Sequence, residues 1–69
     1  MNRTPVTSTT LTSVGYDPRT LTLELEFTSG TLYRYFDVPE SVHLELLRAS
    51  SLGRYFNQSI RNSYRCVQM

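Results

Sequence analysis

The sequence contains one cysteine, Cys66, no lysine, and no apolar stretch long enough to cross a bilayer. A single cysteine excludes an intrachain disulfide. Histidine, cysteine and carboxylate side chains are too few and too scattered for a zinc site. The first ten residues lack the apolar core of a signal peptide, and a spanning helix needs about 20 apolar residues. We therefore expect a cytoplasmic protein with no metal and no cofactor.

Acidic residues are also absent after Glu45, so charge is divided unevenly along the chain. Residues 1–45 carry a net charge of −3 and residues 46–69 a net charge of +4, which together give the overall +1. All the basic residues are arginines, which suit bidentate contacts to phosphate and stacking on bases. A genome that favours arginine codons explains the missing lysine equally well, so composition alone does not identify a partner.

The 69 residues are enough for one small domain, so residues 1–69 are taken as a single unit. A domain of this size buries only about 60% of the surface of its unfolded chain, which leaves little room for a deep catalytic cleft. We therefore expect a binding module and no enzyme. Residues 1–7 are expected to be a flexible lead-in, of which residues 3–6 could join an edge strand.

Three segments have strand patterns, namely residues 9–16, 21–27 and 31–38. The second is the clearest, because leucine and phenylalanine alternate strictly with threonine and glutamate, which predicts one buried and one exposed face. Residues 64–69 are either a last short strand or a tail. The predicted sheet is therefore an antiparallel meander of three to four strands.

Two short helices are predicted in the C-terminal half, which makes the fold class α+β. Pro39 ends the third strand and suits the start of a helix over residues 39–50. A second helix is predicted over residues 50–64, capped by Ser50 or Ser51, with Gly53 either weakening it or allowing close packing. The apolar stripes of the two helices are Val42, Leu46 and Ala49 in the first, and Leu52, Phe56 and Ile60 in the second.

The segments 21–27 and 31–38 should form a hairpin, and the length of its loop decides which face Tyr33 and Tyr35 occupy. With both tyrosines on the open face, they would offer a stacking platform to a ligand. A two-residue loop gives that outcome, but it also places Arg34 on the buried face without a partner, which is costly.

A three-residue loop, residues 28–30, gives Gly30 the left-handed position of a common hairpin turn. It turns both tyrosines toward the leucine side and matches an arginine with a glutamate across the strands. We therefore predict this register, in which the pairs are Leu23 with Tyr35, Leu25 with Tyr33, and Glu24 with Arg34. Leu32 and Phe36 then share the opposite face with charged side chains, where they are either covered or form a small interface.

The best candidate for a binding surface is the C-terminal third. Arg54 and Arg61 are seven residues apart and would share a face of a regular helix, with Asn57 between them. Arginines with aromatic and amide side chains can bind single-stranded RNA. An ordinary solvated helix face accounts for the same residues. The candidate nucleic-acid-binding residues are Arg54, Tyr55, Asn57, Arg61, Tyr64 and Arg65.

No catalytic residue is predicted. His43 lies beside apolar residues of the first helix and is interpreted as a packing or surface residue. Cys66 follows Arg65, which could lower the pKa of its thiol, but there is no second cysteine to resolve a disulfide. No serine or cysteine has a visible partner for nucleophilic activation.

Three segments resemble the KTSC domain: "TPVTSTTLTSVGYDP", "LTLELEFTSGTLYRYFDVP" and "ASSLGRYFNQSIRNSYR". The resemblance covers residues 4–65 and rests on the order and spacing of Tyr33, Tyr35, the Val38-Pro39 step and the run that ends in Ile60-Arg61. This family is named after a short domain at the C-terminus of some lysyl-tRNA synthetases, and it also occurs as a small bacterial or phage protein. RNA is the partner that the attachment to a synthetase implies, and the family implies no catalytic residue.

Two hypotheses follow. The first is a small non-catalytic module that binds RNA through its arginine-rich C-terminal third. The second is a module for protein interaction or homo-oligomerisation with no nucleic-acid role, based on the near-neutral total charge and the patch of Leu32 and Phe36. Neither hypothesis involves a membrane or a metal. The residues expected to be structural are Glu24, Gly30, Tyr33, Arg34, Tyr35, Pro39, Phe56 and Ile60.

Overall fold

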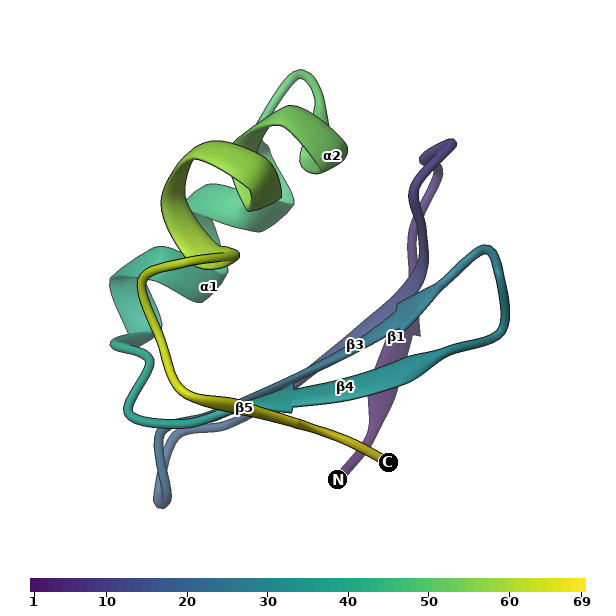
Figure 1. The fold of residues 1–69 in the computed structure, drawn as a ribbon. Coiled ribbons are helices and arrows are strands. Elements are labelled where there is room, and N and C mark those ends of the chain that lie inside the picture. Colours follow the sequence, from purple (N-terminus) through teal and green to yellow (C-terminus); the bar gives the residue numbers. More distant parts are fainter.

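The computed structural model describes residues 1–69 as a five-stranded antiparallel sheet with helices over one of its faces (Figure 1). The fold is α+β, as predicted, with two helices in the C-terminal half. No helix has the length and apolar character needed to span a bilayer. The elements in chain order are β1 (Arg3–Pro5), β2 (Leu11–Asp17), β3 (Thr22–Phe27), β4 (Leu32–Tyr35), α1 (Glu40–Arg48), α2 (Leu52–Tyr55), the π-helical segment η1 (Phe56–Ile60) and β5 (Cys66–Gln68).

The sheet has one strand more than the largest number predicted, because both ends of the chain add a short edge strand. Residues 3–5, within the expected lead-in, form β1 and pair with β2. After the helices the chain returns as β5 and pairs with β4 on the other edge. Pro5 lies on an edge strand, where a missing backbone N–H group is tolerated.

The hairpin between β3 and β4 has the predicted three-residue loop. The backbone N–H of Phe27 donates to the carbonyl of Thr31 at 2.9 Å, and that of Gly30 donates to the carbonyl of Phe27 at 2.9 Å. Gly30 has a φ of +93°, a value that side chains disfavour. All three predicted cross-strand pairs form, namely Leu23 with Tyr35, Leu25 with Tyr33, and Glu24 with Arg34.

The pattern of β3 departs from the prediction at three positions, one of them Thr22, which was expected on the exposed face but is only 7% accessible. Leu21 was expected to begin the strand on the buried side, but it lies in the preceding turn with a φ of 56° and is exposed. Glu24 was expected on an exposed face, but only 6% of it is accessible. Arg3 and Arg34 cover it, with nitrogen–oxygen distances of 2.6 and 3.0 Å. The edge strand β1 supplies Arg3, so a position that was expected to face solvent instead belongs to a buried ion-pair network.

The apolar core lies between the sheet and the helices. Leu46 of α1 is fully buried, and Phe56 and Ile60 of η1 are buried too, as their predicted stripes require. Pro39 directly precedes Glu40, the first residue of α1, and the Ser51 hydroxyl caps α2 by accepting from the backbone N–H of Arg54 at 3.2 Å. The core consists of Leu11, Val14, Leu23, Leu25, Tyr35, Val38, Leu46, Phe56 and Ile60.

Gly53 serves close packing. A β-carbon at this position would collide with the hydroxyl group of Thr10. The absence of a side chain therefore lets α2 approach Thr10, in the segment before β2.

Candidate functional site

The second helix does not continue as a regular α-helix, and this changes the arrangement of the arginines. Residues 56–60 form η1, in which the N–H of Arg61 donates to the carbonyl of Phe56 at 2.9 Å, five residues back. An α-helix would instead bond each residue to the one four back. The spacing of seven positions from Arg54 to Arg61 therefore does not correspond to two regular turns, and the condition for a shared face is not met.

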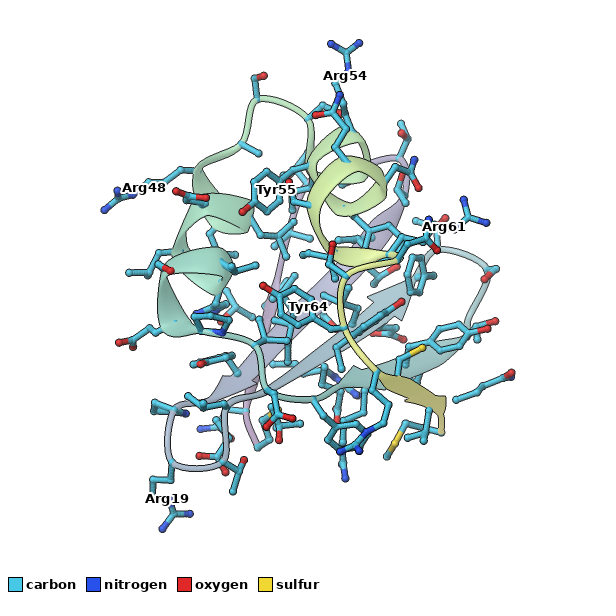
Figure 2. The ribbon with its side chains drawn as sticks, turned by 60° about the vertical axis from the view of Figure 1, so that its left-hand side comes forward. Arg19, Arg48, Arg54, Tyr55, Arg61 and Tyr64 are labelled. Atoms are coloured by element: carbon cyan, nitrogen blue, oxygen red, sulfur yellow. The ribbon has the colours of Figure 1, made fainter.

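The structure distributes the six candidate residues over several places. Asn57 and Arg61 line one cleft, whereas Arg54 and Tyr55 border a smaller hollow at the start of α2. In Figure 2, Arg54 and Arg61 point away from the helical layer in different directions. The hydroxyl of Tyr55 donates to Glu45 of α1 at 2.8 Å, so this ring joins the two helices.

Tyr64 and Arg65 also have structural contacts. Tyr64 is half-buried and packs against the core, below the end of η1 in Figure 2. The guanidinium of Arg65 lies over the ring of Phe36, 5.3 Å from its centroid, a favourable cation–π contact. This contact partly covers the predicted patch, in which both Leu32 and Phe36 are half-buried.

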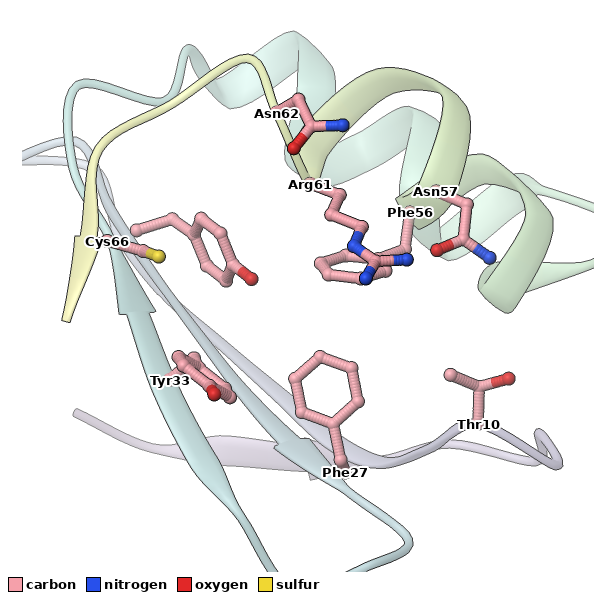
Figure 3. Close-up of a pocket in the computed structure, with 9 residues that line it drawn as sticks. Thr10, Phe27, Tyr33, Phe56, Asn57, Arg61, Asn62 and Cys66 are labelled. Atoms are coloured by element: carbon pink, nitrogen blue, oxygen red, sulfur yellow. The ribbon is translucent and has the colours of Figure 1, made fainter. Parts of the chain in front are cut away.

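The cleft that contains Asn57 and Arg61 has a volume of about 450 Å³ and lies between η1 and the strands (Figure 3). Its aromatic wall comes from the ends of β3 and β4 and from the start of η1. Its polar rim comes from η1, from the turn after it, from β5 and from the segment before β2. The wall consists of Phe27, Tyr33, Tyr35 and Phe56, and the rim of Thr10, Asn57, Arg61, Asn62 and Cys66.

The four rings of the wall form a closed cluster. Phe27 packs edge-on against Tyr33 and Phe56, with centroids 5.7 and 5.2 Å away. Tyr35 packs against Phe56 at 5.8 Å and against Tyr33 at 6.3 Å. Both tyrosines thus point to the leucine side, as predicted. Tyr35 is 4% exposed, whereas Tyr33 is only half-buried and leaves part of its ring open to the cleft.

Most polar groups around this wall are free of partners within the protein. The Tyr33 hydroxyl and the side chains of Asn57, Arg61 and Asn62 take part in no hydrogen bond of the structure. Burial raises the pKa of Tyr35 to about 12, with the nearby Cys66 and Tyr33 adding to the effect. The phenol is therefore neutral at physiological pH and can donate or accept a hydrogen bond.

Paired and unpaired arginines separate along the chain. The three salt bridges use Arg3, Arg19 and Arg34, all in the first half of the sequence. The four arginines after Glu45 form no salt bridge, and three of them extend outward from the helical layer in Figure 2. The unpaired arginines are Arg48, Arg54, Arg61 and Arg65.

Comparison with known proteins places the chain in a family. The model of the KTSC domain matches residues 7–64. The chain belongs to the KTSC domain family. A crystal structure of a KTSC domain protein from Yersinia pestis superimposes with a TM-score of 0.96 at 37% identity, covering 99% of this chain and 96% of that one. The predicted resemblance is therefore confirmed.

Two relatives show the contexts in which similar KTSC domains occur. A protein of Stutzerimonas stutzeri is 55% identical over 58 residues, which are 84% of this chain and 82% of that protein. A lysine–tRNA ligase of Nostoc sp. is 46% identical over 54 residues, 78% of this chain but only 10% of the ligase. The similarity thus covers a domain of that enzyme and says nothing of its catalytic part.

The cleft of this KTSC domain was only partly predictable. Residue type predicted Asn57 and Arg61 as candidates, and the register of the hairpin placed both tyrosines on the inner face, but no pattern in the sequence joined the two groups. Phe27 and Phe56 were assigned to apolar faces, and nothing in the sequence indicated that these faces meet at an open edge. Thr10 and Asn62 carried no signal at all.

His43 is a packing residue of the KTSC domain. Its imidazole stacks on the ring of Tyr16, with centroids 4.7 Å apart and planes 12° from parallel. Burial lowers the pKa of His43, against an opposing effect of Glu40. No group of three or more histidine, cysteine or acidic residues comes close enough together to hold a metal ion.

Proposed function

We propose that this KTSC domain is a non-catalytic module that binds single-stranded RNA. One observation carries the proposal: an open aromatic cleft has the unpaired Arg61 on its rim, and three further arginines without acidic partners lie in the same third of the chain. Such a surface offers cations to phosphates and ring faces to unstacked bases.

The chemistry of the four arginines supports contacts to phosphate. A guanidinium that already pairs with a carboxylate has little to offer a ligand, as in Arg3 and Arg34, which both bind Glu24. Arg48 and Arg54 have no such competitor and extend into solvent (Figure 2), and Arg61 has none at the rim of the cleft. Because they point in different directions, they would hold a strand that passes around the helical layer rather than one flat duplex face.

The relatives support the same class of partner. A stretch similar to this chain occurs in a lysine–tRNA ligase of Nostoc sp., whose name makes tRNA its substrate. A domain carried by such an enzyme would be well placed to contact the tRNA.

Salt-dependent binding tests the proposal. We expect the protein to bind a short, fluorescein-labelled single-stranded RNA, measured by fluorescence anisotropy between about 50 and 200 mM salt. Each phosphate contact contributes about −0.7 to the slope of log K against log salt on a single strand, so four arginines give a slope of up to about −3. Replacing Arg54 and Arg61 by glutamine should lower the affinity and make the slope shallower by about 1.4.

Arg19→Gln is the matched control, because Arg19 already pairs with Asp17, at 3.7 Å, and lies far from Arg54 in Figure 2. It removes one positive charge but should leave affinity and slope nearly unchanged. A protein that ignores single-stranded RNA even at low salt would overturn the proposal.

A homodimer through the outer face of the sheet is the second candidate. No helix covers this face in Figure 1, and Val67, which pairs with the outward-facing Arg34, is 47% exposed. Light scattering should then give the mass of a dimer. Phe36 belongs to the predicted patch on this face, so Phe36→Ser should give a folded monomer. A monomer at all accessible concentrations would exclude this candidate.

A further inference from the structure

We propose that the cleft between η1 and the strands binds one unpaired nucleotide, with its base against the aromatic wall and its phosphate at Arg61. This site would be the place where the proposed RNA-binding function contacts a base. Binding of RNA at the cleft therefore rests on the proposed function, whereas binding of a free mononucleotide does not. The bound group can come from an RNA strand or from a free mononucleotide, since both present the same base and phosphate.

The size and composition of the cleft fit one nucleotide. Sites for small ligands measure about 300–1,000 Å³, and this cleft measures about 450 Å³. The open part of the Tyr33 ring offers a flat π-face beside Phe27. An unpaired base that no longer stacks on its neighbours can regain stacking energy on such a ring. A purely aliphatic ligand would leave the polar rim without partners.

The rim of the cleft favours an anion that carries hydrogen-bonding edges. Arg61 supplies the positive charge, and no aspartate or glutamate is among the lining residues. Asn57 and Asn62 each present an amide that both donates and accepts, which matches the edge of a base. None of these three side chains has a partner inside the protein, so a ligand would break no existing bond.

The π-helical segment is what brings the cation to the rings. Because the N–H of Arg61 bonds to the carbonyl of Phe56, Arg61 lies one turn above Phe56 on the same side of the helix. In an ordinary α-helix, with about 100° per residue, Arg61 would be turned by about 140° away from Phe56. Figure 3 shows the Arg61 side chain extending from the end of η1 toward the rings of the cleft. Single π turns are frequent at functional sites.

The test uses the full chain, labelled with nitrogen-15, and three probes: adenosine 5′-monophosphate, ribose 5-phosphate and a short single-stranded RNA. We expect the mononucleotide and the RNA to shift the amide signals of Tyr33, Phe56, Asn57 and Arg61. Ribose 5-phosphate should shift mainly Arg61, because it lacks the base. This mapping on the unaltered protein does not depend on the folding of any variant.

Two variants then measure the contribution of the site to RNA affinity. Tyr33→Leu should weaken RNA binding by about 5- to 150-fold, the range for losing one stacked base. The control Leu32→Ala truncates a half-buried side chain next to Tyr33 but on the other side of β4, and it should leave affinity within about twofold. Circular dichroism and the amide spectrum verify that each variant is folded.

The outcomes separate the two proposals. Salt-dependent RNA binding that Tyr33→Leu leaves intact would overturn the nucleotide site while the RNA function stands. A mononucleotide that shifts the cleft signals, with no binding of RNA, would support the site and overturn the RNA function. Equal shifts from ribose 5-phosphate and the mononucleotide would overturn the role of the rings.

Discussion

The two faces of the sheet are buried by different means. On the inner face, α1 and η1 cover leucines and aromatic rings, and Leu23 and Leu25 have no accessible surface. On the outer face no helix is present (Figure 1), yet Glu24 is 6% exposed because two arginine side chains lie over it. One strand therefore contributes to an apolar core on one side and to an ion-pair network on the other.

The two faces therefore differ in which charged groups remain available to a ligand. The inner face excludes charge, so the cation of Arg61 remains at the mouth of the cleft and free for a ligand. On the outer face the charged groups pair with one another, because Arg3 and Arg34 both bind the carboxylate of Glu24. Neighbouring residues of β3 can test the comparison directly, since Leu25 faces inward and Glu24 outward.

The largest effect is expected for Leu25→Ala. This leucine is fully buried, and removing its side chain loses apolar burial and leaves a cavity, which costs about 3 kcal/mol. A domain of this size has a total stability of roughly 3–10 kcal/mol, so this loss removes about a third of it or more. Urea unfolding followed by circular dichroism measures the change. A loss below about 1 kcal/mol would contradict a tightly packed inner face.

A smaller but pH-dependent loss is expected for Glu24→Gln. Burial alone would raise the pKa of Glu24, but the guanidinium groups of Arg34 and Arg3 outweigh it and lower the pKa below its ordinary 4.5. Losing the carboxylate leaves both cations unpaired, which costs about 2 kcal/mol, less than for a fully buried pair because both arginines are partly exposed.

The sign of the pH effect follows from the lowered pKa. The carboxylate stabilises the folded state fully above pH 4.5, and this stabilisation is lost as the pH falls through the lower pKa of the folded state. The difference in unfolding free energy between wild type and Glu24→Gln should therefore shrink below pH 4.5. Glu26→Gln is the matched control, because Glu26 accepts only from the Ser13 hydroxyl, at 2.9 Å. A constant difference from pH 7 to pH 3 would contradict the ion-pair network.

The smallest effect is expected for Gly53→Ala, which probes how the helical layer approaches the inner face. Alanine favours helix by about 1 kcal/mol, but its β-carbon would collide with Thr10. We expect a net loss of about 1 kcal/mol in thermal or urea unfolding. Increased stability would show that α2 can move away from the sheet at no cost.

Much of the fold follows from local rules. The loop of residues 28–30 was predictable because glycine at its third position, the cost of burying Arg34 and the Glu24–Arg34 pair all favoured one register. The stripes of Leu46, Phe56 and Ile60 likewise follow from helical spacing. Both edge strands were harder to predict, because three residues are too few to show an alternation.

The candidate site was predictable in its parts but not as an assembly. Asn57 and Arg61 stood out by residue type, and the tyrosines by the geometry of the hairpin. Their meeting depends on how far the helices extend over the sheet and on the π turn of residues 56–60. Hydrophobic spacing alone fits an α-helix equally well there, since Leu52, Phe56 and Ile60 repeat every four residues.

The π turn also determines the direction in which each following side chain points around the helix axis. If the same residues were wound as an ordinary α-helix, the N–H of Arg61 would bond to the carbonyl of Asn57 instead of Phe56, and everything downstream would be displaced around the axis. The guanidinium of Arg61 would then project over a different side, and the chain would enter β5 from an altered angle. The amino-acid sequence would be the same in such a chain, whereas its cleft would have lost its cation.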